Sequence, residues 1–197
     1  MQIRRGIFFQ SSPRNQSAET SPLPHEYRWG PVNEQAIIRD PIFAVKDRRI
    51  KAHTRLADGH ACYGFFNQAG SVAYYMWITI THEAPKAVPW ELNTQFILKP
   101  TRGYFWDCFT APEHRRRGLY RAALNTASTL ARTQGVEKSF ICCLKENIPS
   151  INAIRSVEFR DIFEFTVRRI GPLVLCKRDG RNILVGFGNP KFNLLYE

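Results

Sequence analysis

Three consecutive arginines, Arg115 to Arg117, precede a glycine, and this order indicates a site for an anion. An arginine guanidinium forms charge-assisted hydrogen bonds with phosphate or carboxylate oxygens. Gly118 would let a ligand approach the backbone closely. A helix that begins there presents backbone N–H groups without intrahelical partners and the positive end of its dipole. The alternative is a solvated basic loop before an ordinary helix, so the choice depends on the elements that hold the loop.

The flanking elements are predicted to be a strand and a helix. Residues 104–110 (YFWDCFT) are rich in strand-favouring side chains, and Pro112 marks a turn after them. From Leu119 onward apolar side chains recur at helical spacing, and Gly135 is suited to end the helix. The apolar run at 139–144 predicts a second strand, parallel to the first because a helix connects them. The basic loop therefore lies within a strand–helix–strand unit, where the helix starts.

In this context the loop resembles that of the GNAT superfamily of acyl-CoA-dependent N-acyltransferases. The string Arg115-Arg116-Arg117-Gly118-Leu119-Tyr120 matches the family's pyrophosphate-binding pattern, arginine-x-x-glycine-x-(glycine or alanine), except that Tyr120 replaces the small residue. The resemblance implies acetyl-CoA, or another acyl-CoA, as co-substrate. It also implies that the end of the preceding strand and the loop bind this cofactor. The residues concerned are Phe109, Thr110, Ala111, Arg115, Arg116, Arg117, Gly118, Leu119 and Tyr120.

A second motif downstream extends the resemblance, which covers roughly residues 71–177. Asn147-x-x-Ser150 is similar to the family motif in which Asn and a small polar residue meet the cofactor. Ile154 stands where many members carry a tyrosine that acts as general acid, and Glu158 stands where glycine is usual. These two departures leave open a third class of function, a CoA-binding protein without turnover.

The resemblance implies an α/β (α+β) fold, with one GNAT-like domain at 26–190, a mixed central sheet around the β-α-β unit, and helices on both faces. Residues 10–25 are dominated by Ser, Pro, Gln and Asn, so residues 1–25 are expected to form a flexible arm. The reservation is that the apolar run at 7–9 docks as an edge strand. Residues 191–197 are expected to form a C-terminal tail.

Several segments before the basic loop have weaker patterns. Residues 33–39 predict a short helix, and residues 42–46 a short strand or docked segment. Two strands are expected around the turn at 67–70, and the second, nearly all apolar, is predicted to lie inside the sheet. Residues 85–89, bounded by prolines, predict a loop before a strand at 91–98.

Acyl transfer from a thioester to an amine needs a neutral amine, a stabilised oxyanion and a proton for the departing thiolate. Asp107 is the candidate base, because it is an acid within an apolar strand, where burial would raise its pKa. Alternatively, it pairs with a nearby arginine or a backbone amide. Tyr120 is the candidate acid, with Tyr104 or water as alternatives. Weaker candidates for the base are Glu91, Glu113, His114 and His82.

The net charge of +11 predicts a partner that carries phosphates or an acidic surface. Acyl-CoA is such a partner. The alternative is a nucleic acid, with backbone phosphates on the arginines and bases stacked on aromatic side chains. The candidate stacking residues are Phe65, Phe66, Tyr74 and Trp77. Because they lie in nearly continuous apolar runs, core packing is favoured over stacking, and nucleic acid is the less favoured partner.

The five cysteines show no C-x-x-C spacing and lie mostly in apolar runs, so reduced core thiols and a cytoplasmic location are expected. No cluster has metal-ligand spacing, and no metal is expected. The uncharged run at 59–82 is interrupted at 67–70, which favours a buried hairpin over a membrane span. The sequence leaves open whether the protein is a monomer or a homodimer. The amine acceptor, whether amino sugar, amino acid, peptide amine or polyamine, is also open.

Overall fold

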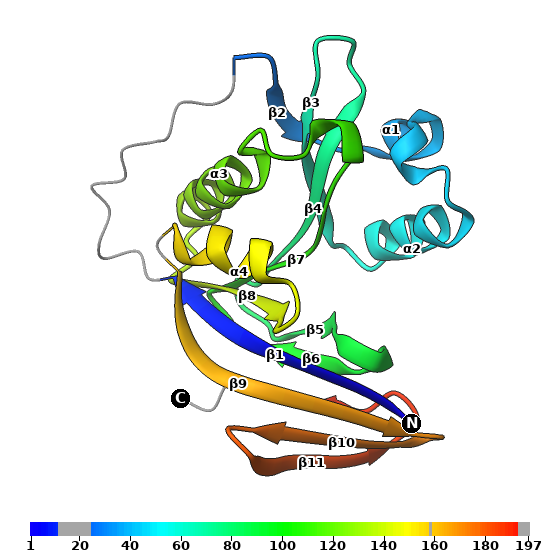
Figure 1. Ribbon diagram of the computed structural model, residues 1–197, viewed down its shortest axis with the longest axis vertical. Coiled ribbons are helices and arrows are strands. Elements are labelled where there is room, and N and C mark those ends of the chain that lie inside the picture. Colours follow the sequence, from blue (N-terminus) through cyan, green and yellow to red (C-terminus); the bar gives the residue numbers. More distant parts are fainter. Residues whose placement is uncertain (12–24, 158, 193–197) are drawn as a thin grey trace.

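A nine-stranded mixed sheet runs through the molecule in the computed structural model, which describes residues 1–11, 25–157 and 159–192 (Figure 1). The strand order is β11-β10-β9-β1-β8-β7-β4-β3-β2. The strands are β1 (Gln2–Ser11), β2 (Arg28–Pro31), β3 (Ala61–Phe66), β4 (Val72–Ile80), β7 (Arg102–Thr110), β8 (Lys138–Leu144), β9 (Phe159–Ile170), β10 (Leu173–Arg178) and β11 (Arg181–Phe187). β7 and β8 run parallel, whereas the other pairs of neighbours in the described residues are antiparallel.

Helices cover both faces of this sheet, as expected (Figure 1). On one face lie α1 (Glu34–Arg39), the 3-10 turn η2 (Pro41–Phe43) and α2 (Lys46–Ala57), and on the other α3 (Leu119–Thr133) and α4 (Ile148–Arg155). A small second sheet, in the order β12-β6-β5, packs into the core on the α2 side. It consists of β5 (Lys86–Pro89), β6 (Gln95–Leu98) and β12 (Lys191–Phe192), with the 3-10 turn η3 (Glu91–Asn93) between β5 and β6. No helix in the described ranges is long and apolar enough to cross a membrane.

β4 shows how one strand serves two cores. Eight of its nine residues are buried, which confirms its predicted place inside the sheet. Successive side chains of a strand point to opposite faces. Tyr75 and Trp77 accordingly join the core under α1 and α2, while Tyr74 and Met76 join the core under α3 and α4. An uninterrupted apolar run therefore fits a strand that is covered on both sides.

β1 corrects the expected flexible arm. It pairs antiparallel with β8 on one side and β9 on the other, so it lies in the middle of the sheet rather than at an edge. Phe8 and Phe9 are fully buried, one in each core. The apolar run at 7–9 is short, but all three of its side chains are buried because both faces of β1 are covered. Residues 12–24 of the expected arm lie outside the described residues.

Other corrections concern elements with weak apolar patterns. The segment at 42–46 is docked rather than a strand, because Ile42 and Phe43 of η2 are buried in the core, and α2 follows it. Only Ala52 is buried among the described side chains of α2, so this helix lacks an apolar stripe that the sequence could show. β5 forms where a loop was expected, and η3 interrupts the expected strand at 91–98, where Leu92 has a positive φ of 54°. Lys191 pairs with Gln95, so the expected C-terminal tail begins with β12. Residues 193–197 are not described.

Candidate functional site

The sheet opens between its two parallel strands. β7 and β8 pair only from Arg102 and Lys138 to Phe105 and Ile141. Beyond these residues β7 continues along β4, and β8 continues along β1. The two strands therefore diverge. Toward their C-terminal ends, the edges that face each other are no longer paired.

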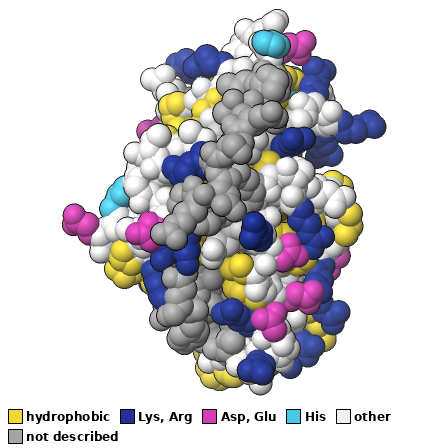
Figure 2. All heavy atoms as spheres, turned by 90° about the vertical axis from the view of Figure 1, so that its left-hand side faces the viewer, with side chains coloured by type: hydrophobic (Ala, Val, Ile, Leu, Met, Phe, Trp, Pro, Cys, Tyr) yellow, Lys and Arg dark blue, Asp and Glu magenta, His cyan; other side chains and the backbone are white. Residues whose placement is uncertain are grey.

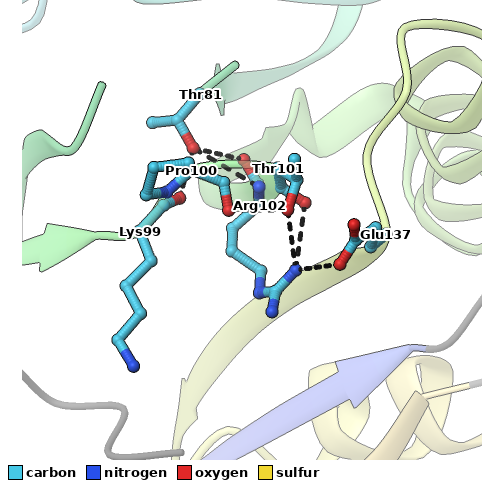
Figure 3. A network of polar contacts seen from close by, with 6 residues as sticks. All are labelled: Thr81, Lys99, Pro100, Thr101, Arg102 and Glu137. Atoms are coloured by element: carbon cyan, nitrogen blue, oxygen red, sulfur yellow. Dashed lines mark hydrogen bonds and ion pairs between the residues drawn. The ribbon is translucent and has the colours of Figure 1, made fainter. Parts of the chain in front are cut away.

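A polar network holds the closed end of this opening (Figure 3). Thr81 Oγ1 donates to the Lys99 carbonyl and accepts from the Arg102 N–H at 3.3 Å. Arg102 Nη1 donates to Glu137 Oε2 at 2.7 Å, and the Glu137 N–H donates to the Thr101 carbonyl at 2.9 Å. The bond from Arg102 lowers the pKa of Glu137, which therefore stays charged at neutral pH. The network fixes the start of β7 to the turn before β8, so the strands part only at their other end.

A cavity of about 1030 Å³ lies at the open end, on the side of α3 and α4. It joins four parts of the chain that the sequence analysis assigned to the cofactor: the end of β7, the basic loop, the first turn of α3 and the start of α4. From the predicted set its lining includes Phe109, Thr110, Arg115, Arg116, Arg117, Gly118, Leu119, Tyr120, Asn147 and Ser150. One predicted residue, Ala111, does not line it, and its N–H points toward β4, where it donates to the Ala73 carbonyl at 2.9 Å. Backbone N–H groups alternate in direction along a strand, so that of Thr110 faces the opening.

The basic loop presents both backbone and side-chain donors to the cavity. Gly118, the N-cap of α3, has φ 75° and no side-chain cap, and a Cβ placed on it would meet no atom within 4 Å. Hence a ligand can approach the free N–H groups of the first helical turn. Arg115 Nε donates to the Thr110 carbonyl at 3.4 Å, and Arg117 pairs with Glu26 at 3.2 Å. Arg116 is exposed. These residues fit the pyrophosphate of CoA, which needs N–H donors and positive charge together.

The start of α4 forms the opposite wall. Asn147 is its N-cap, and its Oδ1 accepts from the Ser150 N–H at 3.3 Å. Ala153 lines the cavity, whereas Ile154 is fully buried in the core below. Many family members carry a tyrosine that acts as general acid at this position. In this chain the position belongs to the apolar core. Glu158, the other departure, lies outside the described residues.

Two tyrosines and a cysteine meet at the inner end of the cavity. The rings of Tyr74 and Tyr120 are 6.1 Å apart between centroids, and Cys108 lies beside both. Burial raises the pKa of both phenols well above 10 and that of the Cys108 thiol to about 12, so all three keep their protons at neutral pH. They can therefore donate to a sulfur or carbonyl oxygen placed there.

Tyr74 was missed as a site residue by the sequence analysis. It stands beside Tyr75 in a strand of aromatic and apolar residues, and nothing in that run indicates which tyrosine faces a cavity. The two tyrosines differ in the face of the sheet to which their side chains point, because Tyr74 belongs to the core on the α3 side and Tyr75 to the core on the α2 side.

Asp107 lies on the other side of β7. The register Trp77↔Trp106 and Tyr75↔Phe109 leaves two residues of β7 opposite one of β4, and Asp107 in this bulge has φ 44°. Its carboxylate pairs with Arg55 of α2, as the alternative interpretation expected. The expected burial is wrong, because the side chain is 40% exposed. Asp107 does not line the cavity, so its role as base remains a prediction.

The weaker candidates for the base lie in different parts of the molecule. Glu91 in η3 is on the α2 side, 3.9 Å from Arg4, and burial raises its pKa. Glu113 and His114, in the 3-10 turn η4 (Pro112–His114), line the cavity, and His114 Nδ1 is 2.9 Å from the Tyr27 hydroxyl. His82 is exposed in a loop.

The aromatic residues considered for base stacking lie in the core, as favoured from the sequence. Each of the candidate side chains is at most 8% exposed, and the set is Phe65, Phe66, Tyr74 and Trp77. All five cysteines are free. No group of His, Cys, Asp or Glu in the described residues could hold a metal ion.

A mixed sheet that opens between parallel strands, beside a basic turn at a helix N-terminus, defines the class of acyltransferase folds that bind acyl-CoA. The acetyltransferase (GNAT) family model matches residues 39–159, more than half of the chain. The chain belongs to this family. No curated protein matches it.

Solved structures with the same fold share little sequence with this chain. A tandem GNAT protein from the clavulanic acid biosynthesis pathway has a TM-score of 0.59 and 14% identity, covering 91% of this chain and 55% of its own. A GCN5-related N-acetyltransferase from Sphaerobacter thermophilus has a TM-score of 0.55 and 10% identity, with 93% and 54% covered. A glucosamine N-acetyltransferase region of a fungal GH3 β-N-acetylglucosaminidase has a TM-score of 0.58 and 15% identity. The match covers 82% of this chain and 20% of that protein. At such identities the likeness shows the fold alone. The chain spans about half of the first two proteins.

Proposed function

We propose that this protein is an acyl-CoA-dependent N-acetyltransferase. It would move an acetyl or other short acyl group to a primary amine of a small molecule, sugar or peptide, by direct attack in a ternary complex. The observation that carries the proposal is the single cavity that connects the N-terminus of α3 and its arginines with the opening between β7 and β8. The basic end suits a pyrophosphate, and the opening in the sheet suits the extended arm that carries the thioester.

The surface charge supports a polyanionic co-substrate. On the side of the molecule where α3 lies, Lys and Arg side chains are scattered over the face and outnumber Asp and Glu (Figure 2). The whole chain has 28 Lys and Arg against 17 Asp and Glu. Such an excess raises the local concentration of an anionic substrate and the rate at which it arrives.

The proposed chemistry divides between the two sides of β7. Asp107, on the α2 side, would accept the proton that the amine loses as its nitrogen attacks the thioester carbonyl. The N–H of Thr110 faces the opening, where it would stabilise the developing oxyanion. Tyr120, protonated on the cavity side, would give its proton to the departing thiolate, with Tyr74 beside it. The acceptor must be neutral to attack, and an ordinary amine has a pKa of about 10, so activity should rise with pH.

The test is acetyl-CoA binding by calorimetry together with amine-dependent thiol release. We expect saturable binding and release of one thiol per acylated amine identified by mass spectrometry. Gly118→Val should abolish binding, because its side chain would enter the space that the pyrophosphate needs and a β-branched residue disfavours a φ of 75°. Binding without turnover on any amine would identify a CoA-binding protein. Tight, salt-sensitive binding of an oligonucleotide with no acetyl-CoA binding would identify the nucleic-acid alternative.

The location is also a proposal. Free thiols at all five cysteines suit a reducing compartment, which supports the cytoplasm. Labelling of the thiols in intact cells and after lysis, followed by mass spectrometry, tests this. Disulfides between these cysteines in cells would contradict it.

A further inference from the structure

Two arginines of α2 lie over the face of β7 that is turned away from α3 and α4. The guanidinium carbon of Arg48 is 4.1 Å from the ring centroid of Phe109, and that of Arg55 is 4.5 Å from the ring of Trp106. The arginines are seven residues apart, about two helical turns, so they share one side of α2. The bulge at Asp107 brings Trp106 and Phe109 onto the same face of β7. The two guanidinium groups therefore follow β7 toward the cavity, which Phe109 lines.

These arginines differ in how their charges are balanced. Arg55 forms an ion pair with Asp107, and its side chain is 16% exposed. Arg48 donates from Nη1 to the carbonyl of Ile42, which is a neutral group. Among the described residues no carboxylate lies within ion-pair distance of Arg48. Arg48 thus keeps an unbalanced charge and further N–H donors while its ring contact holds it in place.

We infer that Arg48 binds an acidic group, a carboxylate or a phosphate, on the amine acceptor. The inference rests on the proposed function. With acyl-CoA in the cavity on the α3 side, the acceptor reaches the thioester from the α2 side, where Arg48 and Asp107 lie. A planar guanidinium binds carboxylate and phosphate oxygens through two parallel N–H bonds. The preferred acceptors are therefore primary amines that also carry an acidic group, such as amino acids or phosphorylated amines.

The experiment compares acceptors that differ only in the acidic group. Glycine is paired with glycinamide, and phosphoethanolamine with ethanolamine, and kcat/KM for thiol release from acetyl-CoA is measured for each. We expect the acidic member of at least one pair to be preferred about tenfold or more, and the pair that responds identifies the anion. Arg48→Gln should lower kcat/KM for that acceptor about ten- to a hundredfold, mainly through KM, and the neutral partner much less. Arg48→Lys, which keeps the charge but loses the planar fork, should fall between.

Arg28 provides the matched control. Its guanidinium is also stacked on an aromatic ring of the sheet, 5.2 Å from the centroid of Phe66, but β2 lies at the far edge of the sheet. Arg28→Gln should leave the acceptor preference unchanged. Equal losses for both members of a pair in Arg48→Gln would show a structural role and overturn the inference. Turnover without preference for acidic acceptors would overturn it while the proposed function stands. No turnover on any amine would overturn both.

Discussion

The two sides of β7 carry different kinds of positive charge. On the α3 side the basic loop is largely exposed and meets the open N-terminus of a helix, so charge and backbone donors face the cavity. On the α2 side the arginines are partly buried, stacked on aromatic rings, and in one case paired with a carboxylate. The first arrangement suits a large anion, whose affinity comes from many donors. The second arrangement suits selection between small acceptors, because only a few charged side chains can contact an acceptor and each is held in place by its ring contact.

The largest expected effect concerns the core that supports the α2 side. Phe8 packs against the rings of Trp90, Phe96, Tyr104, Phe140 and Phe163, with centroid separations of 5.0 to 6.4 Å. Phe8→Ala should lower the free energy of unfolding by about 3–5 kcal/mol, since it removes a buried aromatic residue and leaves a cavity. Chemical denaturation measures this. Phe9→Ala is the control on the other face, and a larger loss there would contradict the idea that the α2 side depends more on aromatic packing.

The next effect concerns Asp107. If Asp107 is the base, Asp107→Asn should lower kcat about a hundredfold or more, with little change in acetyl-CoA affinity. The lost ion pair should cost stability only about 1 kcal/mol or less, because the carboxylate is 40% exposed. Single-turnover kinetics and thermal unfolding measure the two effects separately.

Arg55→Gln is the matched variant for Asp107→Asn, because it breaks the same ion pair and keeps the carboxylate. It should lose similar stability but much less of kcat. If both variants lower the melting temperature and neither lowers kcat, Asp107 is structural. Glu91 would then be the next candidate, because it is also on the α2 side and burial raises its pKa.

A third effect tests the α3 side. Arg115→Ala should weaken acetyl-CoA binding about ten- to a hundredfold, by loss of a charge-assisted contact. The fold should persist, since the Arg115 side chain is exposed. Calorimetry with Arg160→Ala, an exposed arginine of β9, serves as control. Equal affinity for acetyl-CoA in the unchanged protein, Arg115→Ala and Arg160→Ala would show that the loop does not bind the cofactor.

The smallest effect is expected at Tyr120. Tyr120→Phe keeps the ring and should reduce kcat about tenfold at most, because a thiolate with a pKa of about 8.5 leaves readily and Tyr74 remains nearby. Rates at several pH values measure this, and the deficit should shrink as pH rises. A loss above a hundredfold would make Tyr120 indispensable. An unchanged rate would direct the same test to Tyr74→Phe.

Much of the α3 side could be predicted because its signals are local. A strand, a glycine with positive φ and a helix start are encoded within a few residues, and ten of the eleven residues assigned to the cofactor line one cavity. Ala111 does not line it, and its N–H points toward β4 because the direction of N–H groups alternates along a strand. The α2 side depends on long-range contacts. Nothing near Asp107 in the sequence indicates that Arg55, more than fifty residues earlier, will pair with it, or that a bulge will turn it toward α2.

The position of β1 also determines when this fold can be completed. Its partners in the sheet lie 128 to 167 residues later, as the pairs Ser11↔Ser139 and Gln2↔Arg169 show. During synthesis the strand must therefore wait until nearly the whole described chain has emerged. Contacts so distant in sequence slow folding, and strands left unpaired in the meantime are prone to aggregate. A chaperone that holds β1 while the later strands are synthesised should raise the yield of folded protein more than one that acts after release.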